Sequence, residues 1–156
     1  MMRTEDPPDF IGTAIFCDDI RQEIDQKASY IGIYTSGAML VRGDFPVTLA
    51  KFGIAITFAQ KRELFVPNIG IRIFLPGDTD EKASIEADTG PGATIPVLDD
   101  DMPMIMMGAQ MIFSPLVISQ PGVIKVRVLR EGLLHRLGSL DVRKFTTPDS
   151  MVTPSS

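Results

Sequence analysis

The sequence predicts an all-β protein, an antiparallel β-sandwich of immunoglobulin-like or C2-like kind with about eight short strands. Three observations support this fold class. Apolar and polar residues alternate in several segments, as they do in half-buried strands. Gly, Pro and Asp separate these segments, and no segment has the period of a long amphipathic helix. Antiparallel strands of this kind pack as two sheets or close into a barrel.

The length of 156 residues suits one domain that buries a sizeable core. Residues 1–9 are polar and contain prolines, so we expect a flexible N-terminal arm. Residues 10–145 hold the predicted strands in a single β-sandwich domain. Residues 146–156 are rich in Ser, Thr and Pro, and are predicted to form a disordered tail.

The first two strands are predicted at residues 10–17, an apolar run, and at residues 28–34, where aromatic and β-branched side chains fit a pleated surface. Residues 18–25 between them suit one or two helical turns capped by Asp18, or a polar connection. We favour the connection because a strand follows it. Residues 39–41 form a short strand or an edge segment.

Two further segments, residues 51–58 and 68–75, alternate with period two and are separated by a polar turn at residues 60–63. They are predicted to form a hairpin or to be neighbours in one sheet. Residues 82–87 form another short strand. Prolines and glycines across residues 88–103 exclude a helix or a central strand, so an irregular loop of functional or mobile character is expected there.

Strand character resumes over residues 104–118, and a long antiparallel hairpin is predicted within residues 113–145. It follows the turn signal Pro121-Gly122 and reverses at Glu131-Gly132. Its apolar residues point to one face: Ile124, Val126 and Val128 on the way out, and Leu140 and Val142 on the return. Such a hairpin needs a partner over its apolar face, because it is marginal alone in water.

The charge balance argues against nucleic acid and anionic membranes as partners. Lys and Arg total 15 against 20 Asp and Glu, which gives a net charge of -5. Binding to phosphate backbones and to anionic lipid requires a basic surface. A group of basic residues in the C-terminal hairpin is most simply the solvated side of a sheet: Arg127, Arg130, Arg136, Arg143 and Lys144.

Cys17 is the only cysteine, so the chain forms no intrachain disulfide and no Cys-rich metal site. We expect it to be buried and the protein to occupy a reducing compartment. The N-terminus lacks the basic and apolar regions of a signal peptide, and no apolar run approaches the length of a membrane-spanning helix. A cytoplasmic location is predicted, or a virion if the protein is phage-encoded.

No catalytic set, cofactor or metal site is predicted. His135 is the only histidine, and no nucleophile and acid are spaced around it, so we expect a surface or sheet-edge residue. Gly90-Pro91-Gly92 lacks the lysine and helix of a phosphate loop.

The acidic segment after the first strand contains Asp18, Asp19, Arg21 and Glu23. Paired carboxylates at a strand end bind a hard cation or act as acid and base, but they also cap and pair with neighbouring residues. We favour capping and salt bridging.

Two acidic loops are weak candidates for calcium, because C2-type sandwiches bind calcium with aspartates from such loops. Neither loop has the full ligand spacing of a calcium motif. The candidate ligands are Asp78, Asp80, Asp99, Asp100 and Asp101.

Methionines cluster near the strand that begins at residue 104, and four of them are candidate contacts: Met104, Met106, Met107 and Met111. If Met104 and Met106 share one face and Met107 and Met111 share the other, one set lies outside the core. An apolar patch of flexible, polarizable side chains there predicts contact with another protein chain.

The block FCDDIRQEIDQKASYIGIY resembles the opening of a family of small uncharacterised bacterial and prophage-encoded proteins, and PGVIKVRVLREGLLHRLGSLDV is similar to their closing hairpin. The resemblance covers both ends of the domain. It implies a compact β-sandwich, and it puts Asp18, Asp19, Arg21 and Glu23 at a recurring position. It implies no reaction.

The leading hypothesis is a non-enzymatic module that binds or assembles with other protein chains, as a homo-oligomer or in a larger assembly. One version is a phage-type accessory of a capsid or tail. The alternatives are a ligand- or calcium-binding sandwich and a hydrolase that uses Asp18 and Asp19.

Overall fold

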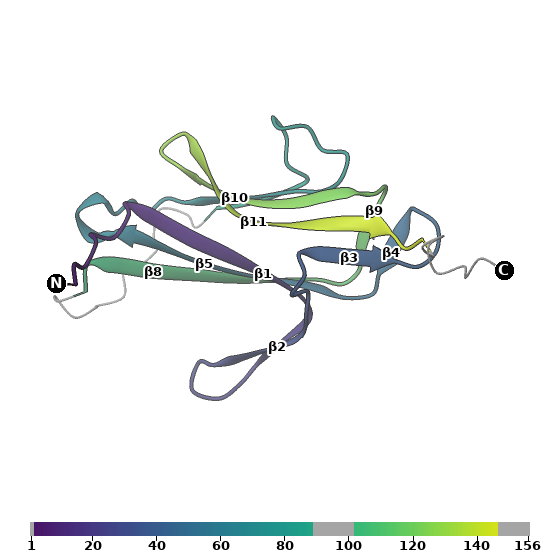
Figure 1. Cartoon of the computed structure of the whole chain (residues 1–156), viewed down its shortest axis with the longest axis horizontal. Coiled ribbons are helices and arrows are strands. Elements are labelled where there is room, and N and C mark those ends of the chain that lie inside the picture. The colour runs from purple at the N-terminus through teal and green to yellow at the C-terminus, as the bar shows by residue number, and fades with distance from the viewer. Residues whose placement is uncertain (1, 89–101, 147–156) are drawn as a thin grey trace, which may run out of the picture.

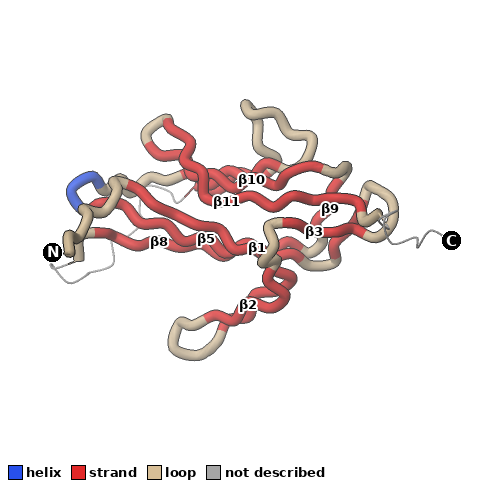
Figure 2. The backbone as a smooth tube through the Cα atoms, in the orientation of Figure 1, coloured by secondary structure: helices blue, strands red, loops and turns tan. Residues whose placement is uncertain are grey.

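The computed structural model describes residues 2–88 and 102–146. Figure 2 shows strands through most of this backbone, with one short 3-10 helix, η1 (Arg62–Leu64), near the N-terminal end of the molecule. The predicted all-β fold is confirmed. The strands are β1 (Phe10–Gln22), β2 (Ala28–Ile33), β3 (Ala38–Val41), β4 (Val47–Leu49), β5 (Phe52–Lys61), β6 (Gly70–Phe74), β7 (Ile85–Asp88), β8 (Met104–Phe113), β9 (Leu116–Ile118), β10 (Gly122–Arg130) and β11 (Leu133–Lys144).

Two main sheets form the layers of the sandwich. Sheet A has the strand order β2-β1-β5-β8, and sheet B has the order β3-β11-β10-β6-β7. Figure 1 shows sheet A below and sheet B above, with the small β4–β9 pair at the end of the sandwich near the C-terminus. Within these sheets, neighbouring strands are antiparallel except for β3 and β11, which are parallel.

The core lies between the facing surfaces of sheets A and B. Alternate residues of β5, including Ile54, Ile56 and Phe58, are buried from one side. Alternate residues of β10 meet them from the other side: Ile124, Val126 and Val128. Each such side chain contributes about 1.5–3 kcal/mol by leaving water. The period-two pattern therefore follows directly from a sandwich with one dry face per sheet.

The predicted C-terminal hairpin is confirmed as β10 and β11. The two strands pair antiparallel, and Glu131 and Gly132 form the turn with φ of 49° and 76°. Positive φ at both central residues matches a turn whose twist suits a hairpin. The register shifts between Val126 and Arg127, which marks a bulge in the pairing.

Two predictions about connections are wrong. Residues 51–58 and 68–75 do not share a sheet, because β5 lies in sheet A and β6 lies in sheet B. The chain crosses between layers through η1, and the predicted turn at residues 60–63 begins inside β5. Residues 18–22 are not a connection either, because pairing with β2 carries β1 as far as Gln22.

The remaining segments follow the prediction more closely. Residues 104–118 form two strands, β8 and β9, separated at Ser114 and Pro115. The strand predicted at residues 82–87 is shorter at its start and begins at Ile85. Most of the predicted loop at 88–103 and most of the predicted tail at 146–156 lie outside the described residues. No helix in the described part of the chain is long and apolar enough to cross a membrane.

Candidate interaction surface

The outer face of sheet A carries no charged residue over four cross-strand rows of β1, β5 and β8. We call this surface the charge-free face. Its most exposed large side chains are Ile11, Met106 and Ile112, with 55%, 54% and 46% of their surface exposed. The rows are Ile11–Ala59–Met106, Thr13–Thr57–Gly108, Ile15–Ala55–Gln110 and Cys17–Gly53–Ile112.

Small residues on β5 form the floor of the charge-free face. Near Gly53, the side chains of Cys17 and Ile20 fold over the sheet, and a Cβ at Gly53 would lie 3.0 Å from Cys17 Sγ. Cys17, Ile20 and Ala55 form a small buried cluster there. Cys17 is a free, buried thiol, as the sequence predicts, and burial raises its pKa.

The hairpin of β1 and β2 projects from sheet A beside this face. β1 pairs with β5 only up to Cys17, and its remaining residues pair with β2 alone. Figure 1 shows this hairpin leaving the lower layer of the sandwich. A cleft of about 720 Å³ lies between hairpin and sheet, lined by Gln22, Gln26, Tyr30, Ile56, Thr57, Gly108, Ala109 and Gln110.

Polar contacts tie the hairpin to β8 across this cleft. The amide of Gln22 donates a hydrogen bond to the amide oxygen of Gln110. The Gln110 amide in turn lies 3.5 Å from the Tyr30 hydroxyl. The charge-free face is therefore partly covered near Gln110 and is open toward Ile11 and Met106.

Asp18, from the predicted acidic segment, is exposed on the β1–β2 hairpin and lies over Gly32. Its Oδ1 accepts a hydrogen bond of 2.7 Å from the Tyr34 hydroxyl. Burial, together with this carboxylate, raises the pKa of Tyr34 well above its usual range. A Cβ at Gly32, where φ is +69°, would lie 2.3 Å from Asp18 Oδ2. A side chain here would be strained by the left-handed backbone and would have to displace the Asp18 carboxylate.

The other three residues of the acidic segment are also in local contacts. Asp19 Oδ1 lies 3.0 Å from Lys51 Nζ, and Arg21 Nε lies 3.8 Å from Asp19 Oδ2. The hydrogen bond from Lys51 is the main cause of the lowered pKa of Asp19. Glu23 accepts a hydrogen bond of 3.1 Å from Ser29. These contacts agree with the salt-bridging interpretation.

The hydrolase hypothesis gains no support from this placement. Asp18 faces Tyr34, whereas Asp19 faces Lys51. Acid–base catalysis by two carboxylates requires both to flank one reacting group.

The methionines of β8 divide between the two faces of sheet A. Met106 is exposed on the charge-free face, and Met104 lies at its end, paired with Lys61 of β5. Met107 and Met111 are partly buried against the core. The predicted division of Met104 and Met106 from Met107 and Met111 is therefore confirmed, and Met106 is the methionine of the four that is most available for contact.

The acidic loop that the structure describes, with Asp78 and Asp80, does not converge on a metal. Asp78 accepts hydrogen bonds from the amides of Leu75 and Ser84, both 2.8 Å, and from the Ser84 hydroxyl at 2.7 Å. Burial acts to raise the pKa of Asp78, but these bonds outweigh it and lower the pKa. Asp80 is exposed and lies 3.6 Å from Lys125.

Within the described residues, no group of three or more His, Cys, Asp or Glu side chains could hold a metal ion. Asp99, Asp100 and Asp101 lie outside the described residues. Asp78 therefore organises its own turn, and calcium binding stays untested.

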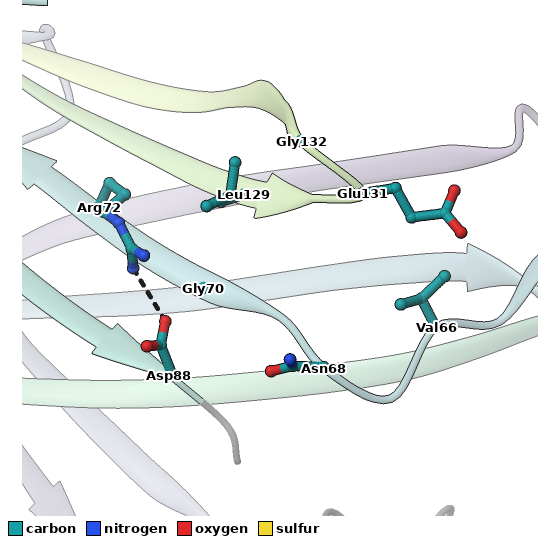
Figure 3. Close-up of a pocket in the computed structure, with 8 residues that line it drawn as sticks. All are labelled: Val66, Asn68, Gly70, Arg72, Asp88, Leu129, Glu131 and Gly132. Carbon is teal, nitrogen blue, oxygen red and sulfur yellow. Dashed lines mark hydrogen bonds and ion pairs between the residues drawn. The ribbon is translucent and has the colours of Figure 1, made fainter. Parts of the chain in front are cut away.

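A second cleft, of about 400 Å³, opens beside sheet B (Figure 3) and is lined by Val66, Asn68, Gly70, Arg72, Asp88, Leu129, Glu131 and Gly132. Arg72 is turned toward Asp88, with Nη1 3.0 Å from the carboxylate, and its Nε lies 3.6 Å from Glu86. The positive charge of Arg72 in this cleft is therefore balanced by Asp88 and Glu86. The cleft brings together no nucleophile and base.

The basic residues of the C-terminal hairpin do not share one face. Arg127 and Arg136 are cross-strand neighbours on the outer face of sheet B, in the same row as Arg72. Burial lowers the pKa of Arg127, and the charge of Arg136 lowers it further. Arg130 instead points to the other side and donates to Gln60 at 2.7 Å.

His135 lies at the edge of sheet B, in the part of β11 that β3 does not reach, but it is not a plain surface residue. Its ring lies 4.4 Å from the ring of Phe10, and its Nε2 is buried without a hydrogen-bond partner in the described structure. Burial lowers the pKa of His135, and the nearby charge of Arg130 lowers it further.

Comparisons of the chain with family models, with curated proteins and with solved structures give no match. The resemblance of the opening block to a prophage-associated family therefore stays a prediction. The contacts of Asp18 and Gly32 nevertheless give that block a structural explanation, because they hold the β1–β2 hairpin in shape.

Proposed function

We propose that this protein is a non-enzymatic interaction module that binds another protein chain through the charge-free face and strand β8. The observation that carries the proposal is the contrast between the two outer faces. Four rows of sheet A lack charge and expose Ile11, Met106 and Ile112. The outer face of sheet B carries Arg72, Arg127 and other charged residues.

This contrast matters because solvent-facing sheets normally carry polar or charged side chains. Ile11 and Met106 flank Ala59 in one row of this face, and exposed apolar side chains grouped on a solvent-facing sheet typically mark a contact site. The family resemblance supports one version of this role, a phage-type accessory protein associated with a capsid or tail.

Photo-crosslinking in the cells that naturally produce the protein tests this proposal. A photoreactive phenylalanine analogue replaces Met106 in one variant and Leu40 in the other. Leu40 is a matched control, because it is an apolar residue with 59% exposure on a strand of sheet B. We expect protein adducts through position 106 and few through position 40. Equal labelling at both positions, or none at position 106, would reject the proposal.

A further inference from the structure

Strand β8 is an edge strand of sheet A. In the part of the chain that the structure describes, it pairs with β5 on one side only. Its ten residues, MIMMGAQMIF, contain no charge and no proline. Natural edge strands usually carry charges, prolines or bulges, because open N–H and C=O groups recruit further strands. β8 carries none of these three features in its own sequence, and the described hydrogen bonds from the β1–β2 hairpin reach it only through the Gln110 side chain.

The other edges of the two main sheets are shorter or interrupted. β3 and β7 have four residues each, and β7 carries Glu86 and Asp88. β2 has six residues, and its backbone departs from the extended form at Gly32, where φ is +69°. Among the described edges, β8 therefore offers the longest regular ladder for another strand.

The sequence of β8 is complementary to itself when read antiparallel. A two-fold interface requires this property, because the same patch meets its own copy. With Ala109 on the two-fold axis, the large apolar residues of the strand from Ile105 to Phe113 meet other large apolar residues on the same face of the sheet. The cross-strand pairs are Ile105–Phe113, Met106–Ile112, Met107–Met111 and Gly108–Gln110, with Ala109 opposite its own copy.

This register also pairs the most exposed side chains of the strand. Met106 and Ile112 are each about half exposed in the single chain. They would cover each other twice, once on each side of the axis. Moving the axis by one residue to Gly108 would set Met106 against the polar Gln110, so the Ala109 register is the best matched.

We propose that β8 pairs antiparallel with β8 of a second copy of this chain, which joins two four-stranded sheets into one continuous sheet. The inference rests on the proposed function, since it names the partner of the same face. Strand addition of this kind supplies main-chain hydrogen bonds for affinity and side-chain pairs for register.

Charge variants test both the pairing and its register. In Met106→Lys/Ile112→Lys, each lysine lies opposite another lysine of the second copy. In Met106→Lys/Ile112→Glu, each lysine lies opposite a glutamate. Sedimentation velocity over about 1 µM to 1 mM should show dimers for the wild type, loss of at least tenfold in association for the Lys/Lys variant, and recovery for the Lys/Glu variant.

A Leu40→Lys variant on β3 is the control and should dimerise like the wild type. Thermal melts confirm that each variant is folded. A wild-type chain that stays at its 17.1 kDa mass throughout the range would overturn the proposal. So would a Lys/Glu variant that associates no better than the Lys/Lys variant.

A cysteine at the axis gives an independent readout. In the proposed dimer, position 109 meets itself at the Cα separation of an antiparallel pair, about 4.5–5.5 Å, which suits a disulfide. Ala109→Cys should form a linked dimer under mild oxidation, whereas the wild type should not, because Cys17 is fully buried. Absence of a linked dimer from a folded variant would count against the pairing.

The adducts formed through position 106 separate this inference from the proposed function. An adduct of twice the chain mass supports the second copy. An adduct of any other mass leaves the interaction module standing and overturns the second copy as its partner.

Discussion

Gln60 is the only polar residue fully buried among the described residues, and it joins three parts of the fold. From β5, its side chain donates to the Val66 carbonyl at 3.0 Å and accepts from the Val66 amide at 3.1 Å. It also accepts from Arg130 Nε at 2.7 Å. The crossover from sheet A to sheet B and the end of the β10–β11 hairpin are therefore fixed to one amide group.

We expect Gln60→Leu to lower the free energy of unfolding by about 2 kcal/mol, because it leaves the partly buried Val66 backbone and Arg130 Nε without their hydrogen-bond partner. Urea unfolding measures the change. Gln120→Leu, at an exposed glutamine, is the control and should change stability by about 0.5 kcal/mol or less. A loss for Gln60→Leu no larger than for this control would show that the network does not stabilise the fold.

His135 predicts a pH dependence of stability. Its pKa is lowered in the folded protein by burial, and it is near its ordinary value of about 6.5 in the unfolded chain. Between these two values the unfolded chain binds more protons, so stability rises with pH. The free energy of unfolding should therefore decrease as the pH is lowered from 8 to 5.5. This window lies above the pH range in which aspartates titrate.

The measurement is urea unfolding at both pH values for the wild type and His135→Gln. The variant should lose less stability on acidification than the wild type. The charge that faces His135 most directly belongs to Arg130, and Asp9 and Glu131 line the same cleft. An equal loss in both proteins would assign the pH dependence to other groups.

The contacts of these residues could not be predicted from the sequence, because their partners are distant in the chain. Gln60 continues the inward parity of Phe52 to Phe58, so a longer strand would have predicted its burial. Its partner Arg130, however, is 70 positions away in the chain. The division of the methionines between two faces can be predicted from their spacing along one strand. The exposure of Ile11 cannot, because it depends on which face of sheet A the second sheet covers.

At the scale of elements, local pairings were predictable and sheet membership was not. The β10–β11 hairpin follows from alternation and a turn in one continuous segment. The assignment of β5 and β6 to different sheets depends on strands distant in sequence, such as β1 and β10. The extension of β1 to Gln22 is not evident from the sequence, because these residues are mostly polar and pair only with the projecting β2.

The β1–β2 hairpin should be sensitive at Gly32. Gly32→Ala combines a left-handed backbone with a clash against Asp18, whereas Gly37→Ala has φ of +74° and open space around its Cβ. We expect a loss of about 1 kcal/mol for Gly37→Ala and a clearly larger loss for Gly32→Ala. Thermal or urea unfolding compares the two variants.

Asp18→Ala in the Gly32→Ala background should recover part of the additional loss, because the nearest clashing atoms belong to the Asp18 carboxylate. If Gly32→Ala is no worse than Gly37→Ala, the contact between Asp18 and Gly32 does not constrain the hairpin.

At the scale of the whole molecule, the two outer faces predict opposite responses to salt. Each chain carries a net charge of -5, so two copies repel at low ionic strength. Association through the charge-free face has no ion pairs to lose. Raising NaCl from about 10 mM to about 1 M shortens the Debye length from about 30 Å to about 3 Å, which removes the repulsion.

The dimer fraction measured by sedimentation should therefore rise with salt. Contact through sheet B would instead place the row of Arg72, Arg127 and Arg136 against acidic groups of the second copy. Salt would screen these ion pairs, so the dimer fraction would fall. The Met106→Lys/Ile112→Lys variant should associate less than the wild type at each salt concentration, because its like charges meet at the interface itself. A fall in the wild type would place the contact on the charged face and reject pairing through β8.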